Sequence, residues 1–458
     1  MKTKMFLTSM LVMAMVAPAY ADVFETSAGA TSPVAGACVQ AQLGTDVGPA
    51  TINAKWTGNK SGAITIDSKL YTSTSDTTGT AATTAATPTP VYTVYGDGTT
   101  PDADGNTGGV YNAIPTTNDT GKITQLTQNP ELTGYTWGGF WTEKTGTGTQ
   151  VVDTSGNFTA DTNTLYTSDT PATATWYAKW TPNIYTVTLR PEYYASSTAT
   201  SSSATSGNPT TTVYEKYATG WYKESTATTQ ITSSVALGTM PTYTGYTFGG
   251  YYTGKAGTGT QIFTAAGKLA NNATATGAKV FADDNGELWA KWTAKTYNIK
   301  YRCGGGADNT DYGTLDPAQE NITFNAYWSG IPAAKQITLG STPTGQPHNS
   351  DSVTGCSRVG FHPTGWSCTY DTGGAAVAAD ITTITSSNKK QWTTASNATC
   401  VLQWTQNTID LSWSSNGGNT YTVSNDAAKT CTYEGAVTLP TNNPTRTGYT
   451  FSGWKLAD

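Results

Sequence analysis

The 458-residue sequence has very little histidine and little charge, and both shortages limit its chemistry. Its only histidines are His348 and His362, and charged residues make up 12% of the chain. Two histidines leave almost no material for a Ser-His-Asp or Cys-His site. No G-x-S-x-G, phosphate-binding loop or H-E-x-x-H motif occurs, and no two carboxylates stand out as a glycosidase pair. The sequence therefore predicts no catalytic residue, no cofactor and no enzymatic activity.

Long apolar runs are also missing, apart from one at the start. Lys2 and Lys4 precede an apolar stretch from Met5 to Val16, and Ala19-Tyr20-Ala21 has the small-x-small pattern that signal peptidase reads. The stretch is shorter than the ~20 residues that span a bilayer. Residues 1–21 are therefore predicted to be a cleaved signal peptide. We expect export to the cell surface or extracellular space, with the periplasm as an alternative, and no later membrane-spanning segment.

Basic residues are too few to favour nucleic acid as a partner. Without the two lysines of the signal peptide, the chain has 23 basic and 31 acidic residues, a formal charge of −8. Nucleic acids and anionic lipids reward clustered Lys and Arg instead. What the chain does have is Thr, Ser, Ala and Gly, together with 14 Trp and 26 Tyr. β-Branched and aromatic residues in polar surroundings predict strands with long loops, divided among several domains.

Internal repetition is visible in a tryptophan that ends a short strand. Trp180 and Trp292 follow Ala-Lys, Trp404 follows Leu-Gln, and successive copies lie 112 residues apart. Five residues after each tryptophan a strand with alternating apolar residues is predicted, at 185–189, 297–301 and 409–413. An earlier Ala-Lys-Trp ends at Trp56.

A second motif lies between these tryptophans. Thr133-Gly-Tyr-Thr-Trp-Gly-Gly-Phe-Trp-Thr142 recurs at 244–253 and, shortened, at 447–454, with a divergent copy at 359–366. Gly249 and Gly250 in this motif predict a bend or bulge. The aromatic residues predicted to form the repeat cores are Trp137, Trp180, Tyr185, Phe248, Trp292, Tyr297, Trp366, Trp404 and Phe451.

Together these motifs resemble the Listeria–Bacteroides repeat, the B-repeat type of internalin B and many bacterial surface proteins. The resemblance covers roughly residues 91 to 458 and is best at 137–185 and 248–297. It implies small β-grasp-like modules in a mainly β, elongated tandem array. The period of 112 residues exceeds the family's usual unit, so insertions such as Ser196 to Thr212 must lengthen the loops.

The predicted organisation follows from the motif positions. After the signal peptide come a Thr/Ala-rich region with a partial repeat (22–90), repeats at 91–181 and 182–293, a divergent disulfide-containing repeat at 294–405, and an incomplete repeat at 406–458.

Six cysteines in an exported chain predict disulfides, and six permit 15 pairings. We favour Cys356–Cys368, flanking the divergent motif, and Cys303–Cys400, joining the opening and closing strands, which leaves Cys38 and Cys431 over. A metal site is not expected, because no C-x-x-C pair accompanies His362. The acidic run 102–106 lacks the Gly and Glu of a calcium loop and is predicted to be a polar turn.

Three functional hypotheses follow. The first is an exported protein that acts in adhesion or interaction with an unidentified protein or glycan, with self-association through the repeats as a further option. The second is a structural spacer that presents an effector or anchor domain. The third is a carbohydrate-binding or hydrolytic secreted protein.

Overall fold

The computed structural model describes residues 56–166, 173–207, 209–304, 312–315, 319–341, 349–377 and 390–456. Strands dominate over helices in these residues, which confirms the predicted mainly β fold class. The predicted signal peptide, Cys38 and His348 lie outside the described residues. The described residues fall into two compact units, one within 56–80, 85–130 and 138–179 and one within 81–84, 131–137 and 180–456. None of the described helices is both long and apolar enough to cross a membrane.

The sheet that contains the first motif copy includes a strand from upstream of residue 91. Strand β1 (Ile64–Asp67) pairs in parallel with β7 (Ala174–Pro182), in a sheet whose order is β1-β7-β5-β6, with β5 at Tyr135–Trp141 and β6 at Gln150–Val152. A second sheet is formed by β2 (Tyr92–Val94), β3 (Gly109–Tyr111) and β4 (Lys122–Ile123). Short 3-10 turns lie at η1 (Lys144–Gly146) and η2 (Ala160–Asn163). The opening strand of this repeat thus lies within the region that the sequence motifs set apart as 22–90.

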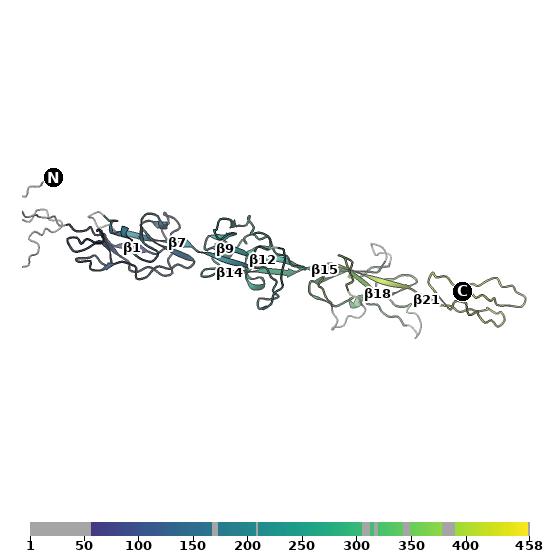
Figure 1. Ribbon diagram of the computed structural model, residues 1–458. Coiled ribbons are helices and arrows are strands. Elements are labelled where there is room, and N and C mark those ends of the chain that lie inside the picture. The colour runs from purple at the N-terminus through teal and green to yellow at the C-terminus, as the bar shows by residue number, and fades with distance from the viewer. Residues whose placement is uncertain are drawn as a thin grey trace, which may run out of the picture. The chain divides into compact units, whose positions relative to one another are not determined.

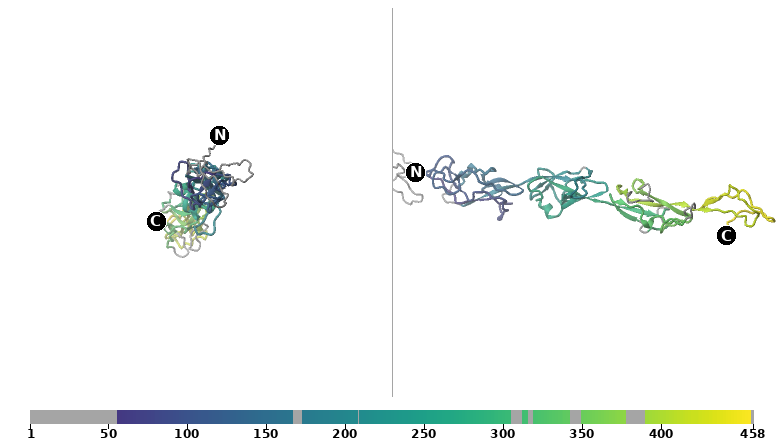
Figure 2. Two further views of the ribbon diagram at one scale, coloured as in Figure 1. Left: turned by 90° about the vertical axis from the view of Figure 1, so that its left-hand side faces the viewer. Right: turned by 90° about the horizontal axis from the view of Figure 1, so that it is seen from below.

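The second repeat forms a seven-stranded sheet of order β11-β10-β9-β8-β14-β12-β13 (Figure 1). Its strands are β8 (Ile184–Arg190), β9 (Thr212–Lys216), β10 (Gly220–Tyr222), β11 (Gln230–Ile231), β12 (Tyr246–Gly254), β13 (Thr258–Phe263) and β14 (Gly286–Ala294). Only β8 and β14 pair in parallel, and the other neighbours are antiparallel. This central parallel pair with antiparallel flanks is a β-grasp-like arrangement. Figure 2 shows the same sheet in teal from below.

Local sequence explains the two main strands of that sheet. In β8, Tyr185, Val187 and Leu189 are buried while their neighbours are more exposed, as expected for a strand with one buried face. In β12, Gly250 has φ +107°, and the register with β14 shifts between Phe248 and Tyr251. The predicted bulge at the glycine pair is confirmed, because a Cβ on Gly250 would collide with the carbonyl oxygen of Phe263. Turn η3 (Lys255–Gly257) and helix α2 (Ala273–Gly277) complete the repeat.

The third repeat keeps the same plan in a smaller sheet of order β16-β15-β20-β18. Its strands are β15 (Thr296–Arg302), β16 (Gln319–Thr323), β18 (Phe361–Tyr370) and β20 (Ala398–Gln406), with β15 and β20 parallel. A separate ladder joins β17 (Tyr327–Trp328) to β19 (Lys390–Gln391), and η4 covers Ala333–Lys335. The fourth repeat starts with β21 (Thr408–Asp410), which pairs with β22 (Thr430–Thr432).

Candidate functional site

One contact recurs with well-defined geometry. A glycine with left-handed backbone conformation is covered by the aromatic ring of a residue from later in the chain, and we call this contact an aromatic seat. Gly245 has φ +79°, and a Cβ there would collide with the ring of Phe324. Lys295 joins the two, because its N–H donates to the Gly245 carbonyl and its own carbonyl accepts from the Phe324 N–H, each at 2.8 Å. The Phe324 ring also meets Tyr246 edge to face, with centroids 5.5 Å apart.

The same seat is built two more times within the second unit. Gly134 and Gly360 have φ of +79° and +73°, and a Cβ on either would collide with a tyrosine ring. The backbone hydrogen bonds to and from the linking residue are again present, at 2.8 to 3.0 Å. The residues are Gly134, Asn183 and Tyr217 in one seat, and Gly360, Asn407 and Tyr433 in the other. A glycine is thus required at these positions both for its φ and for the ring above it.

A second recurring device is a lysine clamp on an inserted loop. The Lys255 ammonium lies 5.1 and 5.2 Å from the ring centroids of Tyr194 and Trp289, and it donates to the Ala199 carbonyl at 3.2 Å. In the first repeat, Lys144 lies over Tyr71 and Tyr177 and donates to the Asp76 carbonyl. Each clamp ties a variable loop to rings of the sheet by cation–π attraction and one hydrogen bond.

The clamp gives a local prediction. Replacing Lys255 with Met keeps the apolar stem but removes the charge, so we expect the loop around Ala199 to lose about 1 kcal/mol of local stability. Hydrogen exchange at residues 194–207 should accelerate about fivefold, while exchange in β8 and β14 stays unchanged. Lys268→Met, at an exposed position, is the matched control. Equal exchange in the two variants would show that the clamp does not order the loop.

The disulfides of the third repeat differ from the predicted pairs. Cys303 is bonded to Cys356 and Cys368 to Cys400, so the predicted Cys356–Cys368 and Cys303–Cys400 pairs are wrong. Strand register explains the error. In the parallel pair β15–β20, Cys400 lies opposite Tyr301, two residues before Cys303, whereas in β18–β20 it lies directly opposite Cys368. Cys431 is a free, half-buried thiol.

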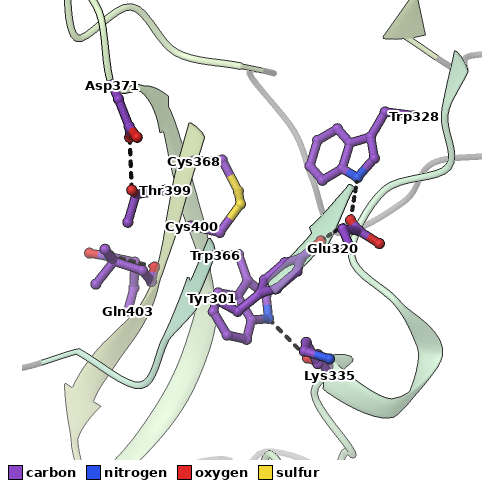
Figure 3. The surroundings of a disulfide bond; sticks show 11 residues. Tyr301, Glu320, Trp328, Lys335, Trp366, Cys368, Asp371, Thr399, Cys400 and Gln403 are labelled. Atoms are coloured by element: carbon purple, nitrogen blue, oxygen red, sulfur yellow. Dashed lines mark hydrogen bonds between the residues drawn. A yellow bond between two sulfur atoms is a disulfide. The ribbon is translucent and has the colours of Figure 1, made fainter. Parts of the chain in front are cut away.

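The Cys368–Cys400 bond lies beside a polar cluster within an aromatic core (Figure 3). Trp366 donates its indole N–H to the Lys335 carbonyl at 3.0 Å and meets the Tyr301 ring at 5.8 Å. The Tyr301 hydroxyl and the Trp328 indole both donate to Glu320. Burial, followed by the bond to Glu320, raises the pKa of Tyr301. The neutral phenol therefore stays a hydrogen-bond donor in this cluster.

The aromatic residues predicted as repeat cores occupy two kinds of position. Trp180, Tyr185 and Trp366 are buried. Phe248 and Trp292 are half-buried against the core of the second repeat, and Tyr297 and Trp404 hold the same place against the core of the third. Trp137 and Phe451 are half-buried as well. The motif aromatics thus border the cores more often than they fill them.

The centres of the cores come from residues that the motif comparison missed. Trp221 in β10 and Trp392 beyond β19 are almost completely buried, and both lie in the variable stretches between motifs. Trp221 donates its indole N–H to the Ala275 carbonyl at 2.9 Å and packs against Phe263, with ring centroids 5.4 Å apart. Because these segments are not repeated in sequence, self-comparison gives no signal for them.

Several titratable side chains of the described residues have hydrogen-bond partners that give them a structural role. Across the described ranges, no group of three or more His, Cys, Asp or Glu is placed to hold a metal ion. His362 contacts the Asn407 side chain at 2.9 Å. Asp102 accepts the backbone N–H groups of Asp104 and Asn106 within its polar turn, and that of Gly58 from an earlier segment. Glu215 is fully buried, which raises its pKa, while N–H donors from the segment before β14 oppose that shift.

Comparison with known protein families gives a match for one segment of the chain. Residues 410–458 match the model of the Listeria-Bacteroides repeat domain. The match begins in β21 and includes Gly448 and Trp454, so the suspected repeat family is confirmed for the fourth repeat. No curated protein and no solved structure matches the chain. The seats at Gly134, Gly245 and Gly360 use the same Gly-aromatic step that occurs at Gly448 in the matched segment.

Proposed function

We propose that this chain is an exported, non-enzymatic repeat protein that mediates adhesion by binding a protein or glycan through loops of its tandem modules. The observation that carries the proposal is the contrast between repeated and variable parts. Sheets, seats and clamps recur, while the intervening loops differ in length and sequence and are largely exposed. A scaffold that is rebuilt in each module and carries variable surface loops suits recognition, because loops change without cost to the core.

Export is supported by three observations. Disulfides persist in oxidising compartments, and the third repeat contains two of them. The sequence of residues 1–21 has the pattern of a signal peptide, and the family matched at residues 410–458 is typical of surface proteins. Fractionation of producing cells, with detection of the processed chain at the surface or in the medium, tests this part. Retention of the unprocessed chain in the cytoplasm would refute it.

The binding role is tested with the whole exported chain on a glycan array and in capture experiments with cell-surface proteins. A matched variant replaces the exposed loop 196–205 with a Gly/Ser loop of equal length, which leaves β8 and β9 intact. We expect at least one ligand class to bind, and loop replacements to reduce binding by about tenfold in the module that contacts it. Turnover of a glycan or peptide that a single carboxylate substitution abolishes would contradict the non-enzymatic role.

The aromatic seats favour a second candidate, a spacer that presents another domain. Three seats with the same pattern of backbone hydrogen bonds join residues from successive repeats. A pure spacer binds nothing in the same assays, and its seat variants change only mechanical or hydrodynamic properties. Ligand binding that is lost on loop replacement would favour the adhesion role over the spacer role.

A further inference from the structure

Each of the three larger sheets contains a pair of parallel strands that come from distant parts of the chain. β1 pairs with β7, β8 with β14 and β15 with β20, each over four residue positions. In the second repeat, residues 187–190 at the end of β8 lie against residues 286–289 at the start of β14. In the third repeat, residues 299–302 of β15 lie in the same way against residues 398–401 of β20. The chain therefore enters each pair at one end of the shared region and leaves it at the other.

Tension along the chain loads these parallel pairs in shear. A pull on the N-terminal end of β8 and an opposite pull on the C-terminal end of β14 slide the two strands past each other. The hydrogen bonds of a parallel ladder are evenly spaced, so all of them resist this sliding together, whereas strands that are peeled apart from one end lose their bonds one at a time. Lys295 alone separates β14 from β15, and Asn407 alone separates β20 from β21, so tension passes directly from one repeat to the next.

An asparagine side chain adds a hydrogen bond to the parallel pair in two repeats. Asn285, just before β14, accepts the Thr186 N–H of β8 at 2.8 Å. Asn397, just before β20, accepts the Asn298 N–H of β15 at 2.9 Å. Both asparagines are exposed, so these bonds extend the ladder and not the packed core. Each bond joins the two strands that tension would slide past each other.

The two disulfides of the third repeat lie in the path of the same tension. Tension that enters through β15 reaches Cys303 and crosses the disulfide to Cys356. It then follows the chain to Cys368 and crosses the second disulfide to Cys400 in β20. The residues enclosed by each bond are bypassed, because the disulfide is the shorter connection. The two loops do not overlap in sequence, so the bypasses act in series.

We propose that this chain is a load-bearing tether, in which the parallel pairs resist tension and the two disulfides limit the extension of the third repeat after its pair has slipped. The load-bearing role rests on the proposed adhesion, because a chain is pulled when the surface or ligand it binds moves. In the third repeat only residues 296–303, 356–368 and 400–406 can be drawn out, which gives less than ~100 Å at about 3.5 Å per residue. Residues 184–294 of the second repeat contain no cysteine, so their opening releases ~300 Å or more by the same measure.

Force spectroscopy on the whole chain, held by tags at its two ends, tests the extension limit. It needs no ligand, so its outcome is separate from that of the binding assays. Without reductant, the opening of the third repeat should give a step of less than ~100 Å. A dithiol reductant is then added while the opened chain is under tension, and it converts each disulfide to two thiols while becoming a disulfide itself.

Reduction should add two further steps of defined length. Cleavage of Cys303–Cys356 frees a sequence separation of 53 residues, or ~180 Å, and cleavage of Cys368–Cys400 frees 32 residues, or ~110 Å. The steps of the second repeat should not change with reductant, because that repeat contains no cysteine. Added steps of other lengths, or a third repeat that opens fully before reduction, would overturn the extension limit.

Asn285→Ala tests the shear geometry. Loss of one hydrogen bond between β8 and β14 should raise the unfolding rate of the second repeat at constant force about fivefold. Asn272→Ala is the matched control. It removes the two hydrogen bonds of Asn272 to Ala275 and Gln261, neither of which joins the sliding strands. Its unfolding rate under force should stay within about twofold of the unchanged chain, because these contacts are intact when the strands begin to slide.

Hydrogen exchange without force separates load from ordinary stability. Asn272→Ala should accelerate exchange in the second repeat at least as much as Asn285→Ala does, because it removes more hydrogen bonds. The order of the two variants should therefore reverse when the chain is pulled through its ends. The same order with and without force, or an unchanged unfolding rate for Asn285→Ala, would show that the parallel pair does not carry the load.

Discussion

Replacing both Cys303 and Cys356 by Ser is expected to lower the unfolding free energy of the third repeat by about 4 kcal/mol. The bond closes a loop between residues 53 apart, and a loop of that length corresponds to about 4 kcal/mol of unfolded-state entropy. Cys303 is fully buried, so its hydroxyl substitute adds an unfavourable polar group. Hydrogen exchange of residues 296–304 and 361–370 measures the loss repeat by repeat, which avoids assigning one free energy to a multi-repeat chain.

The control uses the cysteine outside the bonds. Cys431→Ser should change stability by less than about 0.5 kcal/mol, because the thiol is free and only half-buried. Trypsin offers a direct check on the pairing, since it places the four bonded cysteines in separate peptides, 303–335, 336–358, 359–389 and 391–429. A non-reducing digest should link the first to the second and the third to the fourth. Any other linkage would contradict the observed pairs and the expected loss.

The pairing illustrates where sequence reasoning stops. The motifs associated Cys303 with the opening strand and Cys400 with the closing strand. Cys303 directly follows β15, Cys400 lies in β20, and these two strands are neighbours. Their stagger was not visible, because a register offset of two residues leaves the alternation of buried and exposed side chains unchanged. Only the antiparallel ladder with β18 puts Cys368 opposite Cys400.

Strand positions were easier to predict than repeat boundaries. Alternation at 185–189 and 297–301 and the glycine pair at 249–250 are local signals, and they predicted β8, β15 and the bulge of β12. Strand β1 was not predicted, although Ile64 and Ile66 alternate as in the later opening strands. Trp56 precedes Trp180 by more than the 112-residue period, so alignment by tryptophans did not identify β1.

The aromatic seats could not be predicted from the sequence motifs, for a different reason. The glycine of each seat is part of the repeated motif, but the covering ring comes from a segment without constant spacing, at Tyr217, Phe324 and Tyr433. Nothing in the sequence alone pairs a glycine with a ring 73 to 83 residues later. The contact exists because the linking residue hydrogen-bonds to both, which is a property of the folded backbone.

Trp221→Ala is expected to destabilise the second repeat by about 3 to 5 kcal/mol, the range for deleting a fully buried tryptophan. The side chain is completely buried and packs against Phe263 and Phe281, and its loss leaves the Ala275 carbonyl without its indole donor. The described residues of the second repeat include no disulfide that would reduce the conformational entropy of its unfolded state. Hydrogen exchange in β8 and β14 should accelerate by about two to four orders of magnitude, by about tenfold per 1.4 kcal/mol.

Two further comparisons show which interaction of Trp221 is lost and which repeats lose stability. Trp221→Phe keeps most of the packing and removes only the hydrogen bond, so we expect about 1 to 2 kcal/mol for it. Repeats contact mainly their neighbours, and the third repeat has its own core and two disulfides, so β15 and β20 should keep their protection in Trp221→Ala. Phe324 is the exception, because its seat glycine belongs to the second repeat. If β15 and β20 lost protection together with β8 and β14, the seats would couple the repeats into one cooperative unit, and independent modules would be excluded.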